Sequence, residues 1–172
     1  WPRNNALAEL LDGEWETDVV RHSIQIDPKS GALTWPMQVW SDEGFKLVSR
    51  VEELPALGFV RTRIMWTGAL LPRKVRDEVG RVRTGLFIRG EDEEYPLRFE
   101  LHGFKQAAAL RSILDHPGPE NLIHLSFLGK NFFLEKGLAD WKLYYKVRNM
   151  VWLKLQQSGW PRAFAMGVTY LL

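Results

Sequence analysis

Apolar and polar side chains alternate along several short stretches of the chain, the period-two pattern of strands half-buried in a sheet. These stretches are rich in Val, Ile and Thr and are separated by turn-forming segments such as DPKSG at 27–31. Pro36 marks an edge or a bend in one of them. The expected strands are TDVVRHSIQID, LTWPMQVW, FKLVSRVEEL, GFVRTRIMW and AAALRSILDH (17–27, 33–40, 45–54, 58–66 and 107–116), the last running to the edge of the fold.

The remaining periodic stretches predict helices, so the pattern as a whole indicates a mixed α/β domain. Pro96 and Gly103 are expected to mark the first turn and the end of one helix. The expected helices are NALAELL (5–11), RKVRDEVG (73–80), a segment starting near YPLRFELHGF (95–104), and a long helical region from Lys130 to Ser158.

Composition limits the class of protein without defining an activity. A chain of 172 residues, 45% of them hydrophobic, is long enough for one domain with a core. The absence of Cys excludes disulfides, thiolate metal sites and a Cys nucleophile. Eight Trp are unusual, and they fit either an aromatic core or a surface that binds sugars, an interface or a partner.

Charge is unevenly distributed, although the net charge is only +2. From Lys130 onward, seven Lys and Arg stand against Glu135 and Asp140, so this region carries +5 and residues 1–129 carry −3. A basic, aromatic tail on an acidic body favours contact between the tail and a negatively charged surface. Nucleic acid is not the expected partner, because the basic and aromatic residues form no recognised binding motif.

The main candidate site is a run of four acids, Glu91, Asp92, Glu93 and Glu94, that follows an apolar stretch. One interpretation is structural, since acids in the first turn of a helix are stabilised by its dipole by about 0.3–1 kcal/mol each. The other is catalytic: neighbouring carboxylates raise each other's proton affinity, which suits one of them to take a proton from a hydroxyl nucleophile.

The segment WTGALLPRKVRDEVGRVRTGLFIRGEDEEYPLRFELHGF (66–104) resembles the second half of a family 2 glycosyltransferase, most closely the galactofuranosyl- and rhamnosyltransferase branch. The resemblance extends over roughly residues 1 to 160 and depends on the order and spacing of several short motifs. These are Gly68-Ala69-Leu70, Gly80, Phe87-Ile88, Glu91-Asp92, Glu94, Tyr95, Leu97-Arg98, HGF (102–104), His116 and WKLYYKVRNMVWL (141–153).

The resemblance implies the C-terminal half of a GT-A fold, with a mixed sheet flanked by helices and a C-terminal amphipathic helical tail. It implies that Asp92 is the catalytic base, beside Glu91, which replaces the commoner Asp. The acceptor-binding residues that it implies are Trp66, Thr67, Gly68, Glu94, Tyr95 and Arg98. His116 matches a histidine that helps to hold a divalent metal on the donor's pyrophosphate, although Asp115-His116-Pro117 also fits an ordinary surface loop.

The cofactor that the resemblance implies is Mn²⁺ or Mg²⁺, a hard cation that prefers oxygen ligands. The family holds it with an Asp-x-Asp motif, which occurs nowhere in this chain. In the family that motif is commonly followed by a stretch similar to WPRNNALAELL (1–11), so we expect the chain to be a fragment that begins just after it. The fragment alone is then expected to be inactive.

The tail has two open interpretations. Aromatic and apolar residues recur there at spacings of three and four, at positions 141, 144, 145, 148, 151, 152 and 155, with Arg148 the one charged member. The helix either packs this face against a core or lies in a membrane interface with Lys reaching anionic lipid. The final AFAMGVTYLL is too short to span a bilayer.

The sequence therefore predicts a metal-dependent, inverting glycosyltransferase that moves a sugar from a nucleotide-sugar donor to a glycan or lipid-linked acceptor, in the synthesis of cell-envelope polysaccharide. Residues 1–129 would form its acceptor side and residues 130–172 its basic helical tail. We expect a cytoplasmic protein, with peripheral binding to the inner face of the membrane as an open question. The alternative is a non-catalytic carbohydrate-binding or scaffold domain of the same fold.

Overall fold

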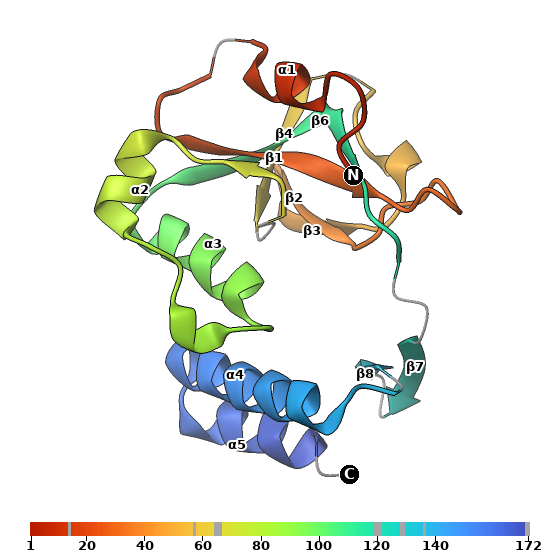
Figure 1. Ribbon diagram of the computed structural model, residues 1–172, viewed down its shortest axis with the longest axis vertical. Coiled ribbons are helices and arrows are strands. Elements are labelled where there is room, and N and C mark those ends of the chain that lie inside the picture. The colour runs from red at the N-terminus through yellow and green to blue at the C-terminus, as the bar shows by residue number, and fades with distance from the viewer. Residues whose placement is uncertain are drawn as a thin grey trace. The chain divides into compact units, whose positions relative to one another are not determined.

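A computed structural model describes residues 1–13, 15–56, 58–63, 67–118, 122–127, 130–135 and 137–170, and β7 and β8 are described by their backbone alone. The protein is a mixed α/β protein with a six-stranded mixed sheet, flanking helices and two C-terminal helices (Figure 1). The chain divides into two units, one of Trp1–Val82 with Asp92–Gly118 and one of Arg83–Glu91 with Pro119–Leu172.

The first unit is built on the sheet, whose strand order is β3-β2-β4-β6-β1-β5. β1 and β6 are parallel, and every other neighbouring pair is antiparallel. The elements are α1 (Ala6–Leu11), β1 (Val19–Ile26), β2 (Met37–Ser41), β3 (Gly44–Val48), η1 (Val51–Glu53), β4 (Phe59–Arg63), β5 (Ala69–Leu70), α2 (Arg73–Val79), α3 (Glu91–Leu101) and β6 (Lys105–Asp115).

Helices cover both faces of the β1–β6 pair, because successive side chains of a strand point to opposite faces. On one face Arg21 donates a hydrogen bond to the carbonyl of Leu10 in α1, and Ser112 donates one to Ala6. On the other face Val20 packs in a buried cluster with α2 and α3. The members of that cluster are Val20, Val75, Val79, Tyr95, Phe99 and Phe104.

His22 lies in the middle of β1 and is fully buried. Its neighbours across the sheet are Ala69 of β5 and Ala108 of β6, so no acid lies opposite it in either ladder. Burial lowers the pKa of His22 to about 4, and the nearby side chain of Gln106 opposes this shift without cancelling it. The imidazole is therefore neutral in the folded protein at neutral pH.

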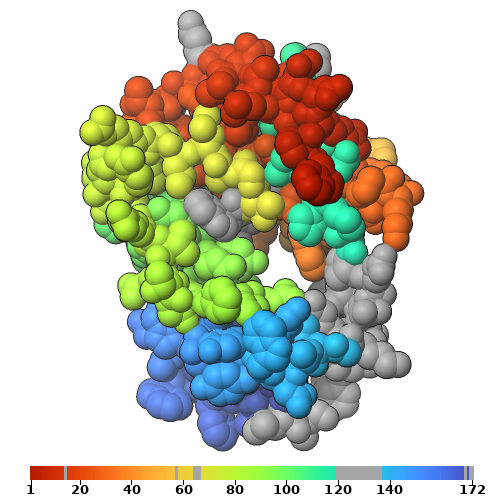
Figure 2. Space-filling model, viewed as in Figure 1, coloured from red at the N-terminus to blue at the C-terminus, as the bar shows by residue number. Residues whose placement is uncertain are grey.

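The second unit contains η2 (Thr84–Leu86), β7 (Leu122–Phe127), β8 (Lys130–Glu135), α4 (Asp140–Ser158) and α5 (Trp160–Thr169). β7 and β8 form an antiparallel hairpin. α4 and α5 pack against each other across Gly159, which has a left-handed φ of 76° and ends α4, and the two helices form one continuous surface in Figure 2. We find no helix among the described residues with the length and apolarity needed to span a bilayer.

Several expectations about individual elements are wrong. α3 begins at Glu91, not near Tyr95, so Pro96 lies in the middle of the helix and the acids form its first turn. Residues 130–135 form β8 where a helix was expected, and the helical region begins at Asp140. β6 lies between β4 and β1 inside the sheet and does not run along its edge.

We predict that His22 makes the stability of the first unit depend on pH. Its folded pKa of about 4 lies below the value of 6.5 for an ordinary His, so the unfolded chain binds a proton first as the pH falls. The free energy of unfolding should drop by about 2 kcal/mol from pH 7 to pH 5 through this residue alone. The measurement is amide exchange of β1 and β6 in urea at both pH values.

The variants His22→Gln and His102→Gln test the assignment. His22→Gln should remove most of that pH dependence, because the replacement does not titrate. His102 is exposed, so His102→Gln should leave it unchanged. An equal pH dependence in the wild type and in His22→Gln would contradict the prediction.

Candidate active site

The parallel strands β1 and β6 end at the same edge of the sheet, and the turn at Thr67-Gly68 lies beside the C-terminal half of β1. The N–H of Ser23 donates to the carbonyl of Gly68 over 3.3 Å. Gly68 has a φ of 69°, and a Cβ there would lie 2.2 Å from Cδ1 of Leu114. Because the left-handed backbone and the close approach of Leu114 both disfavour a side chain, glycine suits this turn.

His116 follows β6 at the same edge and is held there by its backbone. Its N–H donates to the carbonyl of Ile26 over 2.9 Å, and its carbonyl accepts a hydrogen bond from Thr34 Oγ1 over 2.7 Å. The imidazole Nδ1 lies 3.0 Å from the carbonyl of Pro117. When Nδ1 carries the proton and donates to that carbonyl, Nε2 is the nitrogen with a lone pair.

The predicted acids lie in the first turn of α3. α3 is joined to β6 by the short turn at His102–Phe104, where the N–H of Gly103 donates to Glu100 and that of Phe104 donates to Phe99. Asp92 is exposed in the first turn of α3, and Glu91 is half-buried.

Three residues of α3 hold the helix against the end of α2. Arg98 Nε lies 2.8 Å from Oε1 of Glu94, and these side chains are only 16% and 7% exposed. The guanidinium donates to the carbonyls of Val79 and Arg81, each over 2.8 Å. Tyr95 Oη donates to the carbonyl of Gly80 over 2.7 Å. We call Glu94, Tyr95 and Arg98 the α3 anchor.

Burial raises the pKa of Tyr95, although the charge of Arg98 opposes the shift. The phenol therefore keeps its proton and remains a hydrogen-bond donor to Gly80. The acceptor-binding role expected for the α3 anchor stays a prediction, and these contacts give its three residues a structural task in addition. Asp92 lies one turn before this anchored part of the helix, which limits how far its carboxylate can move.

The predicted residues thus fall into three positions. Gly68 and His116 lie along the C-terminal half of the β1–β6 pair, Asp92 and Glu91 begin α3, and the α3 anchor contacts the end of α2. Thr67 is exposed beside Gly68. Trp66, the remaining predicted acceptor-binding residue, lies outside the described residues.

The described residues do not build a metal site by themselves. Among residues 1–118, apart from the gaps at 14, 57 and 64–66, and in the described parts of 122–170, no three His, Asp or Glu side chains cluster as metal ligands would. Asp115 is engaged by Arg3 at 2.8 Å, and Asp27 accepts hydrogen bonds from Lys29 N and Ser30 Oγ. His116 can supply at most one ligand of a metal whose other ligands come from elsewhere.

Sequence reasoning assigned no role to Arg148 and Asn149, which position the segment before α3. Within the second unit Arg148 donates to the carbonyl of Gly85, and Asn149 Nδ2 donates to that of Arg89. A Cβ on Gly90 would lie 3.0 Å from Leu153 Cδ1. Asn149 and Leu153 are the buried positions of α4, whereas Trp141 and Tyr144 of its aromatic face are exposed.

The chain matches no family model, no curated protein and no solved structure. The resemblance to glycosyltransferases therefore stays a prediction from the order and spacing of motifs.

We predict that the Glu94–Arg98 pair stabilises the first unit. Arg98→Ala should lower its free energy of unfolding by about 3–5 kcal/mol, because the buried carboxylate of Glu94 loses its counter-charge. The double variant Glu94→Gln/Arg98→Met should recover part of this loss, since no buried charge is left behind. Urea unfolding monitored by amide exchange in α3 measures both.

Arg73→Ala is the matched control. This variant removes the ion pair between Arg73 and Asp77, whose side chains are 86% and 52% exposed, respectively. The free energy of unfolding should fall by less than about 1 kcal/mol. A stability of Arg98→Ala equal to that of Arg73→Ala would contradict the structural role.

Proposed function

We propose that this chain is the acceptor side of an inverting, metal-dependent glycosyltransferase with a GT-A fold. The observation that carries the proposal is Asp92, an exposed carboxylate in the first turn of a helix whose next turn is held on the end of α2. Ligands of open α/β sheets generally bind outside the carboxyl edge of parallel strands, where His116 follows β6. The order of the motifs along the sequence, from Gly68 through Asp92 to His116, supports the same proposal.

Under this proposal Asp92 is the general base. Its carboxylate takes the proton of an acceptor hydroxyl as the oxygen attacks the anomeric carbon of the donor sugar, while the bond to the nucleoside diphosphate breaks on the opposite face. The configuration at that carbon is inverted. Glu91 stands beside the base, while Thr67 and Gly68 border the acceptor, and the α3 anchor keeps the helix in place.

A divalent metal, when bound, would neutralise charge on the departing diphosphate. His116 would contribute one ligand through Nε2, and the carboxylate ligands would lie outside this chain. The donor is then a nucleotide sugar, and the acceptor is a glycan or a lipid-linked glycan of the cell envelope. The protein would work in the cytoplasm, against the inner face of the cytoplasmic membrane.

Asp92→Asn tests the proposal in the full gene product. Turnover of nucleotide sugar in the presence of acceptor should fall by about 10²–10⁴-fold, with little change in KM, because the amide cannot accept the proton. The measurement is release of nucleoside diphosphate across a panel of nucleotide sugars. Glu93→Gln, which removes the neighbouring charge of the same cluster, is the control and should retain most of the turnover.

Turnover of Asp92→Asn within threefold or so of the wild type would remove the assignment. Glycan binding by the wild type without turnover of any nucleotide sugar would favour the alternative, a non-catalytic carbohydrate-binding domain of the same fold.

The second unit supports a further part of this proposal, contact with an anionic membrane surface. Trp160, Phe164 and Val168 recur every four residues along α5 and are exposed, the two aromatics at 70% and 66%. The same two helices also carry five cationic residues, Lys142, Lys146, Arg148, Lys154 and Arg162. Aromatics at headgroup depth with cations beside them are the pattern of an interfacial helix.

We predict that the double variant Trp160→Ser/Phe164→Ser binds vesicles of anionic phospholipid about tenfold or more weakly than the wild type, because two apolar anchors are lost. Co-sedimentation with vesicles measures this, and binding to the wild type should weaken with added salt. Leu101→Ser is the control, since Leu101 is 83% exposed on α3. Equal losses in both variants would contradict a specific role of α5.

A further inference from the structure

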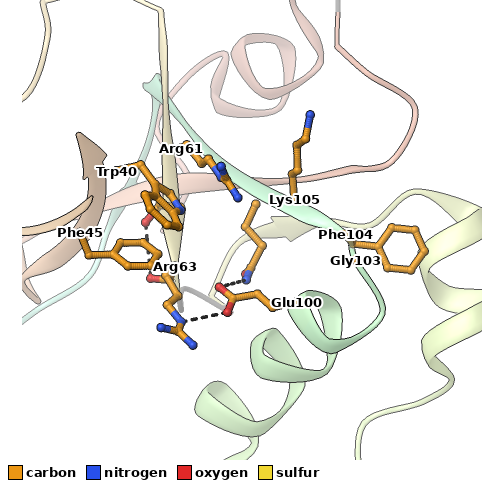
Figure 3. A pocket seen from close by; sticks show the side chains of 10 residues that line it. Trp40, Phe45, Arg61, Arg63, Glu100, Gly103, Phe104 and Lys105 are labelled. Atoms are coloured by element: carbon orange, nitrogen blue, oxygen red, sulfur yellow. Dashed lines mark hydrogen bonds and ion pairs between the residues drawn. The ribbon is translucent and has the colours of Figure 1, made fainter. Parts of the chain in front are cut away.

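A groove of about 520 Å³ lies in the first unit where β4 and β6 separate. The two strands pair only from Phe59–Arg61 to Ala107–Ala109, and beyond Arg61 β4 continues along β2 instead. The C-terminal end of α3 closes the gap with Glu100, and Gly103 lies next to it (Figure 3). The volume is within the range of pockets that bind small molecules.

One wall of the groove is a row of stacked side chains from three neighbouring strands. Trp40 of β2 pairs directly with Phe45 of β3, and their ring centroids are 4.0 Å apart. Arg61 of β4 lies over the Trp40 ring at 4.5 Å, and Arg63 lies 5.3 Å from the Phe45 ring. We call these four residues the arginine–aromatic wall.

Stacking fixes the plane of each guanidinium and leaves its N–H edges available for hydrogen bonds. Figure 3 shows Arg61 and Arg63 at the two ends of this wall, with Glu100 across from Arg63. An N–H edge held in this way matches the two oxygens of a carboxylate or of a phosphate. The wall is therefore a preorganised surface for an oxyanion.

The charges of the groove differ along its length. Arg63 Nε lies 2.9 Å from Oε2 of Glu100, so this arginine is already neutralised. Lys105 pairs with Glu16 at 2.8 Å, and in Figure 3 its ammonium points away from Glu100. Within the described part of the chain, the guanidinium of Arg61 has its stacking contact with Trp40 and no acidic partner.

We propose that this groove binds an anionic saccharide, with its carboxylate or phosphate on Arg61 and its hydroxyls toward Glu100. An oxyanion is attracted to the Arg61 end and repelled from the Glu100 end. The carboxylate of Glu100, held by Arg63, can accept hydrogen bonds from sugar hydroxyls, and Gln106 Nε2 lies 3.5 Å from Glu100 Oε1 on the same side. The ligand that fits carries negative charge at one end and neutral hydroxyls at the other.

A nucleotide fits the wall less well. Trp40 lies between Phe45 on β3 and Arg61 on β4, so a nucleobase must compete with both neighbours for a face of the indole ring. The stacking platforms that bind single-stranded nucleic acid need such a face. The remaining ring edges and guanidinium edges favour a saccharide with an anionic substituent.

This inference deepens the proposed function, because it names an acidic glycan as the acceptor class, and to that extent it rests on the proposed function. Binding at the groove is nevertheless measured without any transfer reaction. If no anionic sugar binds the groove, the turnover test of Asp92→Asn still decides the proposed function. If the turnover test fails, the measured binding at the groove still stands.

The experiment is a titration of ¹⁵N-labelled protein with oligoglucuronate, glucose 6-phosphate, neutral maltotriose and uridine monophosphate. The indole N–H signal of Trp40 and the Nε–H signals of Arg61 and Arg63 report on the groove. Both anionic sugars should shift these signals at concentrations on the order of millimolar or below. Maltotriose should bind at least tenfold more weakly, and the difference between the two anionic sugars identifies carboxylate or phosphate as the preferred group.

Arg61→Gln should weaken binding of the better anionic sugar by at least tenfold, and Arg61→Lys should retain part of it, since charge persists without the planar fork. Lys46→Gln is the matched control, because Lys46 is exposed next to Phe45 but on the other face of β3. Four results would each overturn the proposal. Two concern the anionic sugars: neither of them shifts the signals, or Arg61→Gln binds the better one as tightly as the wild type does. The other two concern the comparison ligands: maltotriose binds as tightly as the anionic sugars, or uridine monophosphate binds more tightly than they do.

Discussion

The parallel pairing of β1 with β6 is the constraint on which the first unit depends. It joins residues 19–26 to residues 105–115 across most of the unit's sequence, and parallel strands can meet only through a long crossover. That crossover contains β2 to β5, α2 and α3, and antiparallel neighbours complete the sheet on both sides of the pair. The same pairing buries His22 and sets His116 at the carboxyl edge of the two strands.

α3 carries the acids in its first turn at an energetic cost that its anchor offsets. Pro96 has no N–H to donate to the carbonyl of Asp92 four residues earlier, which weakens the first turn. The negative charges of that turn are stabilised by the helix dipole, and the anchor of Glu94, Tyr95 and Arg98 fixes the next turn on α2. Burying an ion pair requires such extra hydrogen bonds, here from Arg98 to two backbone carbonyls.

The sequence pattern predicted the elements that local patterning determines, and it missed those that depend on distant residues. β1 and α2 lie where alternation and a terminal glycine indicated them, because both signals are local. The start of α3 was misplaced because Pro96 was taken as a helix-starting residue, whereas buried contacts of Tyr95 and Phe99 support it inside the helix. The groove could not be foreseen, since Trp40, Arg61 and Glu100 meet only through the sheet register and the turn after α3.

α3 carries both the proposed catalytic base and one side of the proposed glycan-binding groove. Asp92 lies in its first turn and Glu100 near its last, and eight residues of helix separate them by about 12 Å. Glu100 is held by Arg63 of β4, while the α3 anchor holds the middle of the helix on α2, so the sheet and α2 together fix the direction of α3. An acceptor bound by its charged end at the arginine–aromatic wall would therefore need to extend along α3 by about this distance to present a hydroxyl to Asp92. That requirement favours an acidic glycan of several sugars over a single sugar as the acceptor.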